Sequence, residues 1–216
     1  RSPRFFVHDT DYGMLIGARR NAESDSYYWR ITHWLMPSFN LFGGISADGS
    51  TPIGRGILWV PADNVTSTVY SVSWRWDAHF TEPDIEAAEA FSGPVYPGSF
   101  EPAANMGNDY LIDRSLQREV TFTGLGSIQT QDLAVQEAMG AVVDRSLEHL
   151  GTSDTAIIRA RRKLLQGATD LLEGSEPYQV NHKNVYRVRA ADTILSRERG
   201  FDGPSMEEHC RISERD

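Results

Sequence analysis

The hydrophobic repeat of this chain changes once, from a two-residue alternation in the first third to a helical repeat in the second half. Residues 4–76 contain β-branched and aromatic runs joined by short polar turns, and residues 69–76 alternate strictly. Short connections favour antiparallel pairing, because parallel strands need long crossovers. Strands followed by helices predict an α+β fold with a helix against an antiparallel sheet. A sheet wrapped on a long C-terminal helix would enclose a cavity, a common place for an apolar ligand.

Turn residues and helical stripes predict the elements that follow the strands. Ser153 is the expected N-cap of the long helix, whose apolar stripe runs from Ile157 to Leu172 and is closed by Gly174. The remaining predictions are a short helix over Pro83–Phe91, a helix from Gln131 to about Gly151, and a short helix near Ala190–Arg199. The Gly- and Pro-rich segment 92–128 is typical of a lid, a binding loop or disorder.

Charge and composition exclude several classes of protein. A chain of 216 residues that is 40% hydrophobic can bury one sizeable core, so we expect a single domain. The net charge of −9 disfavours a nucleic-acid partner, whose phosphates need a basic surface. No run of 18 apolar residues predicts a membrane span. The single cysteine, Cys210, cannot form an internal disulfide or hold an iron–sulfur cluster, which fits a cytoplasmic location.

Local catalytic motifs do not identify a function. The six histidines lie at least 25 positions apart, which excludes a two-histidine metal motif on one helix turn. The chain has no Gly-x-Ser-x-Gly elbow, no phosphate-binding glycine loop and no dinucleotide fingerprint. The motifs therefore indicate only a soluble α+β domain.

Three stretches together carry a family resemblance. One runs from Asp9-Thr10-Asp11-Tyr12-Gly13 through Tyr27-Tyr28-Trp29-Arg30-Ile31-Thr32 to Leu35-Met36-Pro37-Ser38-Phe39. The second is Gln131-Asp132-Leu133-Ala134-Val135-Gln136-Glu137, and the third joins Val143-Asp144-Arg145-Ser146 to Glu148-His149-Leu150-Gly151-Thr152-Ser153-Asp154. In order and spacing they resemble the catalytic domain of Rieske-type non-haem iron oxygenases of the phthalate dioxygenase-like group.

The resemblance implies a fold and a chemistry. The fold would be a helix-grip, START/Bet v1-like domain. The parent protein would hydroxylate or O-demethylate an aromatic substrate with O₂ at a mononuclear Fe(II) held by two histidines and a carboxylate. Electrons would come from a reductase through a Rieske [2Fe–2S] cluster, and a homotrimer is implied. Residues 1–216 would be a portion of the catalytic domain without the Rieske domain and the two-histidine segment. Alone, such a chain should not bind Fe(II) tightly.

The resemblance also proposes site residues. Asp132 lies at the position of the iron-binding carboxylate, at an expected helix start. The alternative is an Asp that only complements the helix dipole. Arg30 and Arg75, each in an aromatic strand, could grip a substrate carboxylate, or could be solvated or paired with a neighbouring acid. Asn40 could orient a substrate or be an ordinary loop residue.

Two other classes of function remain open. One is a helix-grip module that binds an apolar or aromatic ligand and performs no chemistry. The other is a partner subunit whose role is assembly. Cysteine and histidine pairs upstream of residue 1 would favour the enzyme, and their absence would favour the binding module.

Overall fold

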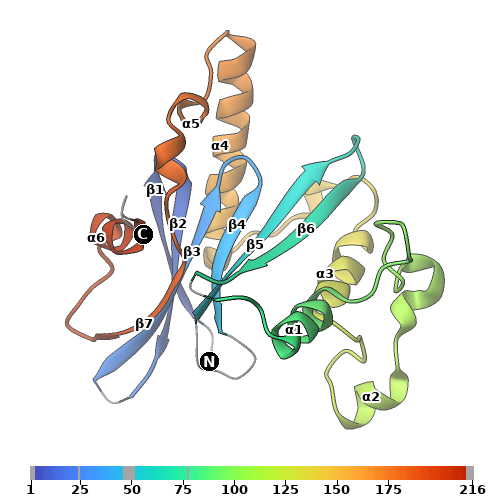
Figure 1. Ribbon diagram of the computed structural model, residues 1–216. Helices are drawn as coiled ribbons and strands as arrows, with labels where there is room; N and C mark the ends of the chain where they lie inside the picture. The colour runs from blue at the N-terminus through green and yellow to red at the C-terminus, as the bar shows by residue number, and fades with distance from the viewer. Residues whose placement is uncertain (1–2, 24, 46–51, 77, 213–216) are drawn as a thin grey trace.

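The computed structural model describes residues 3–212 except 24, 46–51 and 77. It confirms the α+β class: the described residues form a seven-stranded antiparallel sheet with helices against it (Figure 1). Six strands follow one another in sequence order. The seventh pairs with residues 26–31 of the third strand, and the fourth pairs with residues 33–35 of that same strand. The strands are β1 (Arg4–Thr10), β2 (Gly13–Asn21), β3 (Ser26–Leu35), β4 (Phe39–Ile45), β5 (Pro52–Pro61), β6 (Ser67–Trp74) and β7 (Ala191–Ser196).

Two predicted helices are confirmed. The first begins with a proline in its first turn, and the long helix is followed by Gly174 at a φ of 83°. The α-helices are α1 (Glu82–Ser92), α2 (Arg114–Glu119), α3 (Ile128–Glu137), α4 (Thr155–Leu172), α5 (Tyr178–Asn181) and α6 (Gly203–Cys210), and the 3₁₀ turns are η1 (Met106–Leu111), η2 (Arg145–Leu147), η3 (Thr152–Asp154) and η4 (Lys183–Tyr186). None of the helices in the described part of the chain has the length and apolar content needed to cross a membrane.

Three sequence predictions were wrong. The helix expected to continue to Gly151 ends at Glu137, and Gly140 follows at a φ of 87°, a backbone conformation that suits glycine and ends a helix. Ser153 lies inside η3, and Asp154 is the N-cap of α4. The residues near Ala190–Arg199 form strand β7, because pairing with β3 supplies their hydrogen bonds.

One face of the sheet carries the main core. We call it the tail face, because the tail segments on either side of β7, residues 183–190 and 201–210, pack on it. Phe201 stacks on Trp29 at 5.5 Å between ring centroids, and Trp29, Met206 and Cys210 belong to one buried cluster. A second cluster on the same face joins Val185 and Val188 of the tail to Tyr12 and to Leu residues of the sheet. Burial raises the pKa of the Cys210 thiol to about 12, so this cysteine is an apolar core residue.

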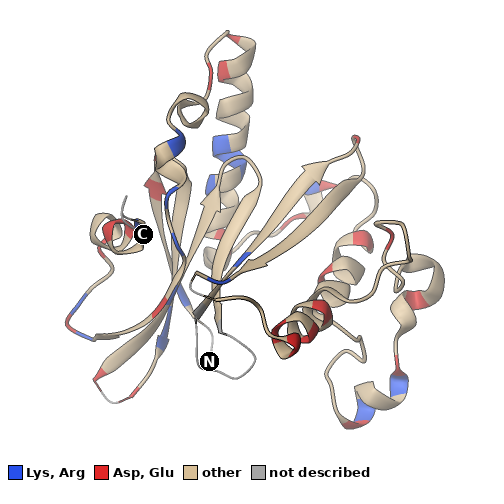
Figure 2. Ribbon diagram, in the orientation of Figure 1, with Lys and Arg blue, Asp and Glu red and all other residues tan. Residues whose placement is uncertain are grey.

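The opposite face, the helix face, holds α4 at one end. Arg159 and Lys163 of this helix pair with Asp9 of β1 at 3.3 and 3.4 Å, and Arg161 pairs with Glu148 at 2.7 Å. The basic cluster on α4 therefore fastens the helix to the sheet and to the segment after α3. Figure 2 shows this cluster on α4 and the acidic residues on α1, which lies against the other end of the sheet.

Candidate active site

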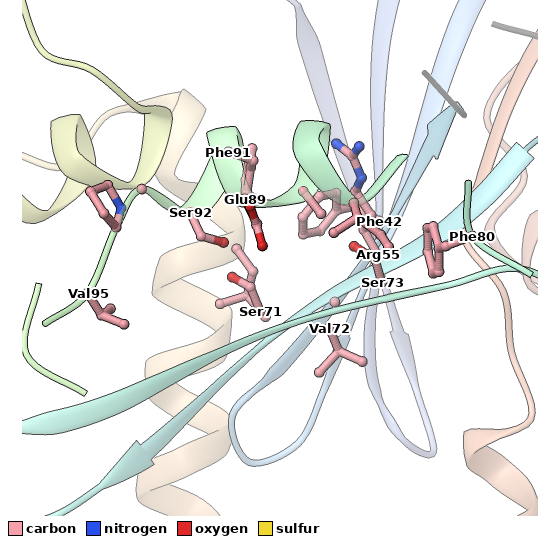
Figure 3. Close-up of a pocket in the computed structure, with 16 residues that line it drawn as sticks. Phe42, Arg55, Ser71, Val72, Ser73, Phe80, Glu89, Phe91, Ser92 and Val95 are labelled. Atoms are coloured by element: carbon pink, nitrogen blue, oxygen red, sulfur yellow. The ribbon is translucent and has the colours of Figure 1, made fainter. Parts of the chain in front are cut away.

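A cavity of about 680 Å³ lies on the helix face, between strands β5 and β6 and helix α1. The strand register places Asn40 beside Ile57 and Phe42 beside Arg55, so these four side chains share the helix face. Figure 3 shows the aromatic rings and the few polar groups around the space. Its lining includes Phe42, Arg55, Ile57, Ser71, Ser73, Phe80, Ile85, Glu89, Phe91 and Val95. Its size and mainly apolar wall suit a small organic ligand.

A buried ion pair fixes the position of α1 over the cavity. Arg75, just after β6, donates to Asp84 of α1 at 3.2 Å, and Asp84 is only 4% exposed. The same carboxylate accepts hydrogen bonds from the backbone N–H and the hydroxyl of Thr81, the N-cap of α1. The first turn of α1 is therefore tied to the end of the sheet, with the cavity beneath the rest of the helix.

Helix α3 contacts one residue of the cavity wall. Gln129 of this helix donates to the hydroxyl of Ser71, one of the lining residues. The Ser127 hydroxyl caps the helix by accepting from the backbone N–H of Thr130. These contacts hold α3 beside β6.

Asp132 is the fifth residue of α3 and its side chain is exposed. The helix begins at Ile128, not near Gln131, so Asp132 lies past the first turn, where the helix dipole acts most strongly. It lies three residues after Gln129, on the same side of the helix. Asp132 lines neither this cavity nor the smaller one between α1, η1 and α3, and no described residue forms an ion pair with it.

The other carboxylate of this helix, Glu137, has a partner. Tyr110 donates its hydroxyl to Glu137 at 2.6 Å, so the carboxylate is held against η1 and is not free to project into solvent. Burial and this hydrogen bond raise the pKa of Tyr110 to about 12.

The structure gives the predicted arginines carboxylate partners. Arg30 lies 3.3 Å from Asp192 of β7, which also accepts a 2.5 Å hydrogen bond from Tyr28. Arg75 pairs with Asp84, as described above. Neither arginine lines the cavity, and Asn40 lies half-buried on the helix face outside it. The structure thus separates Asp132, Arg30 and Arg75 among three places on the sheet and its helices.

Arg55 is the cavity residue that the sequence prediction missed. It lies in β5 between Gly54 and Gly56, outside any aromatic run, so nothing in its neighbourhood marked it as a ligand-binding residue. Only the antiparallel register brings it to the helix face beside Phe42. Its guanidinium lies 5.8 Å from the ring centroid of Phe91 on α1.

Comparison with known proteins identifies the domain. Residues 1–208 match the family described as "LigXa C-terminal domain like". The chain belongs to this LigXa C-terminal domain-like family. The match confirms the predicted resemblance to the catalytic domain of Rieske-type oxygenases.

Two curated relatives of the LigXa-like domain are oxygenase subunits. The 3-chlorobenzoate-3,4-dioxygenase oxygenase subunit of Comamonas testosteroni is 30% identical over 182 residues, covering 76% of this chain and 41% of the relative. The phthalate 4,5-dioxygenase oxygenase subunit of Pseudomonas putida is 27% identical over 206 residues, covering 92% of this chain and 45% of the relative. The chain thus spans less than half the length of either protein.

The family resemblance names one residue of this domain, Asp132, as an expected iron ligand. Within the described part of the chain, no three His, Cys, Asp or Glu side chains gather as a metal site would require. His33 cannot bind iron, because it is fully buried and both of its ring nitrogens are hydrogen-bonded, one to the Tyr12 hydroxyl and one to the Arg189 carbonyl. Asp132 has the donor type that Fe(II) prefers, a hard carboxylate oxygen, on a helix that is joined to the cavity-lining Ser71 through Gln129, and its side chain is exposed.

Proposed function

We propose that this domain is the catalytic-domain portion of an oxygenase that hydroxylates or O-demethylates an aromatic substrate. The observation that carries the proposal is the family match over residues 1–208, which includes Asp132 and every residue that lines the cavity. The two relatives named as oxygenase subunits of aromatic dioxygenases support the same reaction class. An aromatic-lined cavity of about 680 Å³ has room for a substituted benzene ring.

We assign the third iron ligand to Asp132 and the other two to histidines outside this sequence. Mononuclear Fe(II) bound there would supply the activation of O₂, with electrons delivered by a reductase through a Rieske [2Fe–2S] cluster. A helix fixes a carboxylate better than a loop does, and α3 is tied to the sheet through Gln129 and Ser71. The family resemblance adds the expectation of a homotrimer.

The residues of this chain would bind the substrate and exclude water from it. Phe42, Phe80 and Phe91 supply an apolar wall on both the sheet and the helix side of the cavity. The first residues of the 92–128 segment, through Val95, form one edge of that wall. We propose that this segment covers the bound substrate, which would keep water from the reacting atoms.

The iron content of an Asp132→Ala variant tests the assignment. In the full-length protein, we expect Asp132→Ala to lose the mononuclear iron and at least 100-fold in turnover, and to keep the visible absorption of the cluster. Iron per protomer is measured by plasma mass spectrometry, with Asp202→Ala as a matched exposed control. If Asp132→Ala kept the mononuclear iron, the ligand assignment would be wrong.

The same preparation separates the enzyme from a helix-grip binding module that performs no chemistry. The cavity alone would suit either role. A full-length protein that binds aromatic ligands but never takes up mononuclear iron, and never consumes O₂ with a reductase, would favour the binding module.

A further inference from the structure

We propose that Tyr110 and Glu137 position the carboxylate of Asp132 by holding the last turn of helix α3 in place. The inference deepens the proposed function, since it rests on Asp132 as the iron ligand. It comes from the 2.6 Å hydrogen bond between the Tyr110 hydroxyl and the Glu137 carboxylate, and from the unusual backbone of the turn that carries the tyrosine. Both residues act through Asp132, so they are positioning residues.

The side chain of Asp132 has no support of its own. It is exposed, and among the described residues none forms a hydrogen bond or an ion pair with its carboxylate. Its place is therefore set by the backbone of α3, a helix of ten residues that lies beside α1 (Figure 1). Gln129 holds the start of this helix to Ser71 of the sheet, which leaves the end of the helix to be fixed by other contacts.

Glu137 is the last residue of α3, where a short helix most needs support. The ends of helices lack hydrogen-bond partners, so short helices unwind from their ends. In an α-helix each N–H donates to the carbonyl four residues earlier, so the Asp132 carbonyl accepts from the N–H of Gln136. Unwinding of the last turn would break that bond and make residue 132 part of the loose end. The hydrogen bond from Tyr110 opposes this unwinding.

The turn that carries Tyr110 is strained and braced by hydrogen bonds. Asp109, Tyr110 and Leu111 all have left-handed backbones, with φ of 51°, 54° and 53°. Residues other than glycine adopt this conformation singly and at a cost, so a run of three persists only where neighbouring contacts hold it. The N–H of Tyr110 donates to the Asn105 carbonyl at 2.9 Å, and the Asn105 N–H donates to the Asn108 side chain at 3.0 Å. Tyr110 is thus a rigidly held donor for α3.

The Tyr110 hydroxyl keeps its proton throughout the neutral range. Burial, together with the hydrogen bond to Glu137, raises its pKa to about 12 from an ordinary value of 10. The hydroxyl therefore remains a donor at any pH near neutrality, and the contact with α3 does not depend on the exact pH. A permanent contact of this kind suits a role in positioning.

Amide hydrogen exchange in the full-length protein tests whether the bond holds the helix. Tyr110→Phe removes only the hydroxyl, and we expect it to speed exchange of the amides of residues 134–137 about 10-fold. Glu137→Gln keeps an acceptor for the hydroxyl and should change exchange less than about 3-fold, whereas Glu137→Ala should match Tyr110→Phe. Tyr178→Phe, at a tyrosine of α5 that is 51% exposed, is the matched control and should have no effect.

The affinity of the full-length protein for Fe(II) tests whether the helix end positions Asp132. We expect Tyr110→Phe to weaken Fe(II) binding about 10-fold, the size of loss that follows removal of a group that orients a metal ligand. Glu137→Gln should retain the parent affinity to within about 3-fold, because its amide oxygen can still accept the hydrogen bond. Asp109→Ile should act like Tyr110→Phe, because a β-branched residue disfavours the left-handed backbone of the turn.

The outcomes separate this inference from the proposed function. Unchanged exchange or unchanged Fe(II) affinity in Tyr110→Phe would overturn the inference, even if Asp132→Ala lost its iron. Faster exchange in Tyr110→Phe, combined with iron retained by Asp132→Ala, would contradict the proposed ligand and still support the role of Tyr110 in holding α3. An equal loss of Fe(II) affinity in Glu137→Gln and Glu137→Ala would also overturn the inference, since the charge and not the hydrogen bond would then be responsible.

Discussion

At the scale of single residues, His33 is a buried polar group that is fully satisfied. Its Nδ1 accepts from the Tyr12 hydroxyl at 2.7 Å, and its Nε2 donates to the Arg189 carbonyl at 3.0 Å. Burial lowers the pKa of His33 to about 4 from an ordinary value of 6.5. The neutral imidazole thus links β3 to the chain segment that leads into β7.

This pKa predicts a loss of stability in mild acid. Below pH 6.5 the unfolded chain binds a proton at His33 that the folded chain refuses, so the free energy of unfolding should fall by about 3 kcal/mol between pH 6.5 and pH 4. Urea denaturation across this range should show that loss in the parent protein and in His182→Gln, whose histidine is exposed. His33→Phe should be less stable at neutral pH and should lack this part of the slope. Parallel slopes would contradict the prediction.

The sequence predicted site residues only where the neighbouring residues form a recognisable pattern. The segment around Asp132 carries a family pattern, which singled out this carboxylate among 30 acidic residues. Arg30 and Arg75 were also predicted as site residues because of their aromatic neighbours. In the structure Arg30 pairs with Asp192, which is distant in sequence, and Arg75 pairs with Asp84, which lies across a turn. Arg55 has no local signal, because its place in the cavity depends on the pairing of β5 with β4 and β6.

At the scale of elements, the sequence predicted those strands and helices whose conformation is determined by their own residues. β3 is a run of aromatic and β-branched residues, β6 alternates from Tyr70 onward, and α4 has an apolar stripe ended by a glycine. β7 was mistaken for a helix because six residues carry little periodicity, and its strand conformation depends on hydrogen bonds to β3. The β-branched pair Thr193–Ile194 was the available signal.

The ion pair between Arg75 and Asp84 that holds α1 against the sheet can be tested by mutation. Asp84→Asn removes the charge that pairs with the buried Arg75 guanidinium, which leaves a cation without its partner. We expect the free energy of unfolding to fall by about 3 kcal/mol, and ligand affinity for the cavity to weaken because α1 forms its roof. Urea denaturation measures the first effect, with the exposed Glu86→Gln on the same helix as control. Equal midpoints for the two variants would show that the ion pair does not hold α1.

At the scale of the whole molecule, the two faces of the sheet have different tasks. Both buried clusters of apolar residues involve the tail face, whereas the cavity and the candidate ligands lie on the helix face. The sequence indicated which residues of a strand share a face. It could not show which of the two faces the tail segments 183–190 and 201–210 would cover.

A core substitution on the tail face should therefore affect stability without affecting binding. Met206→Ala removes a side chain that is 5% exposed, and we expect it to lower the free energy of unfolding by about 3 kcal/mol. The affinity of the cavity for an aromatic ligand should stay within 2-fold of the parent value. Leu172→Ala, at a side chain that is 90% exposed, should change neither quantity. A large loss of affinity in Met206→Ala would show that the two faces are coupled.

The register of β5 has a consequence for substitutions in this strand. Arg55 and Ile57 point to the cavity, while their neighbours Gly54 and Gly56 lie under the rings of Trp74 and Phe39 on the tail face. Adjacent positions of a single strand thus have separate physical constraints, one set from the cavity and one set from the core. A single substitution at position 55 or 57 would change the cavity wall, with the hydrophobic side of the sheet left as it was.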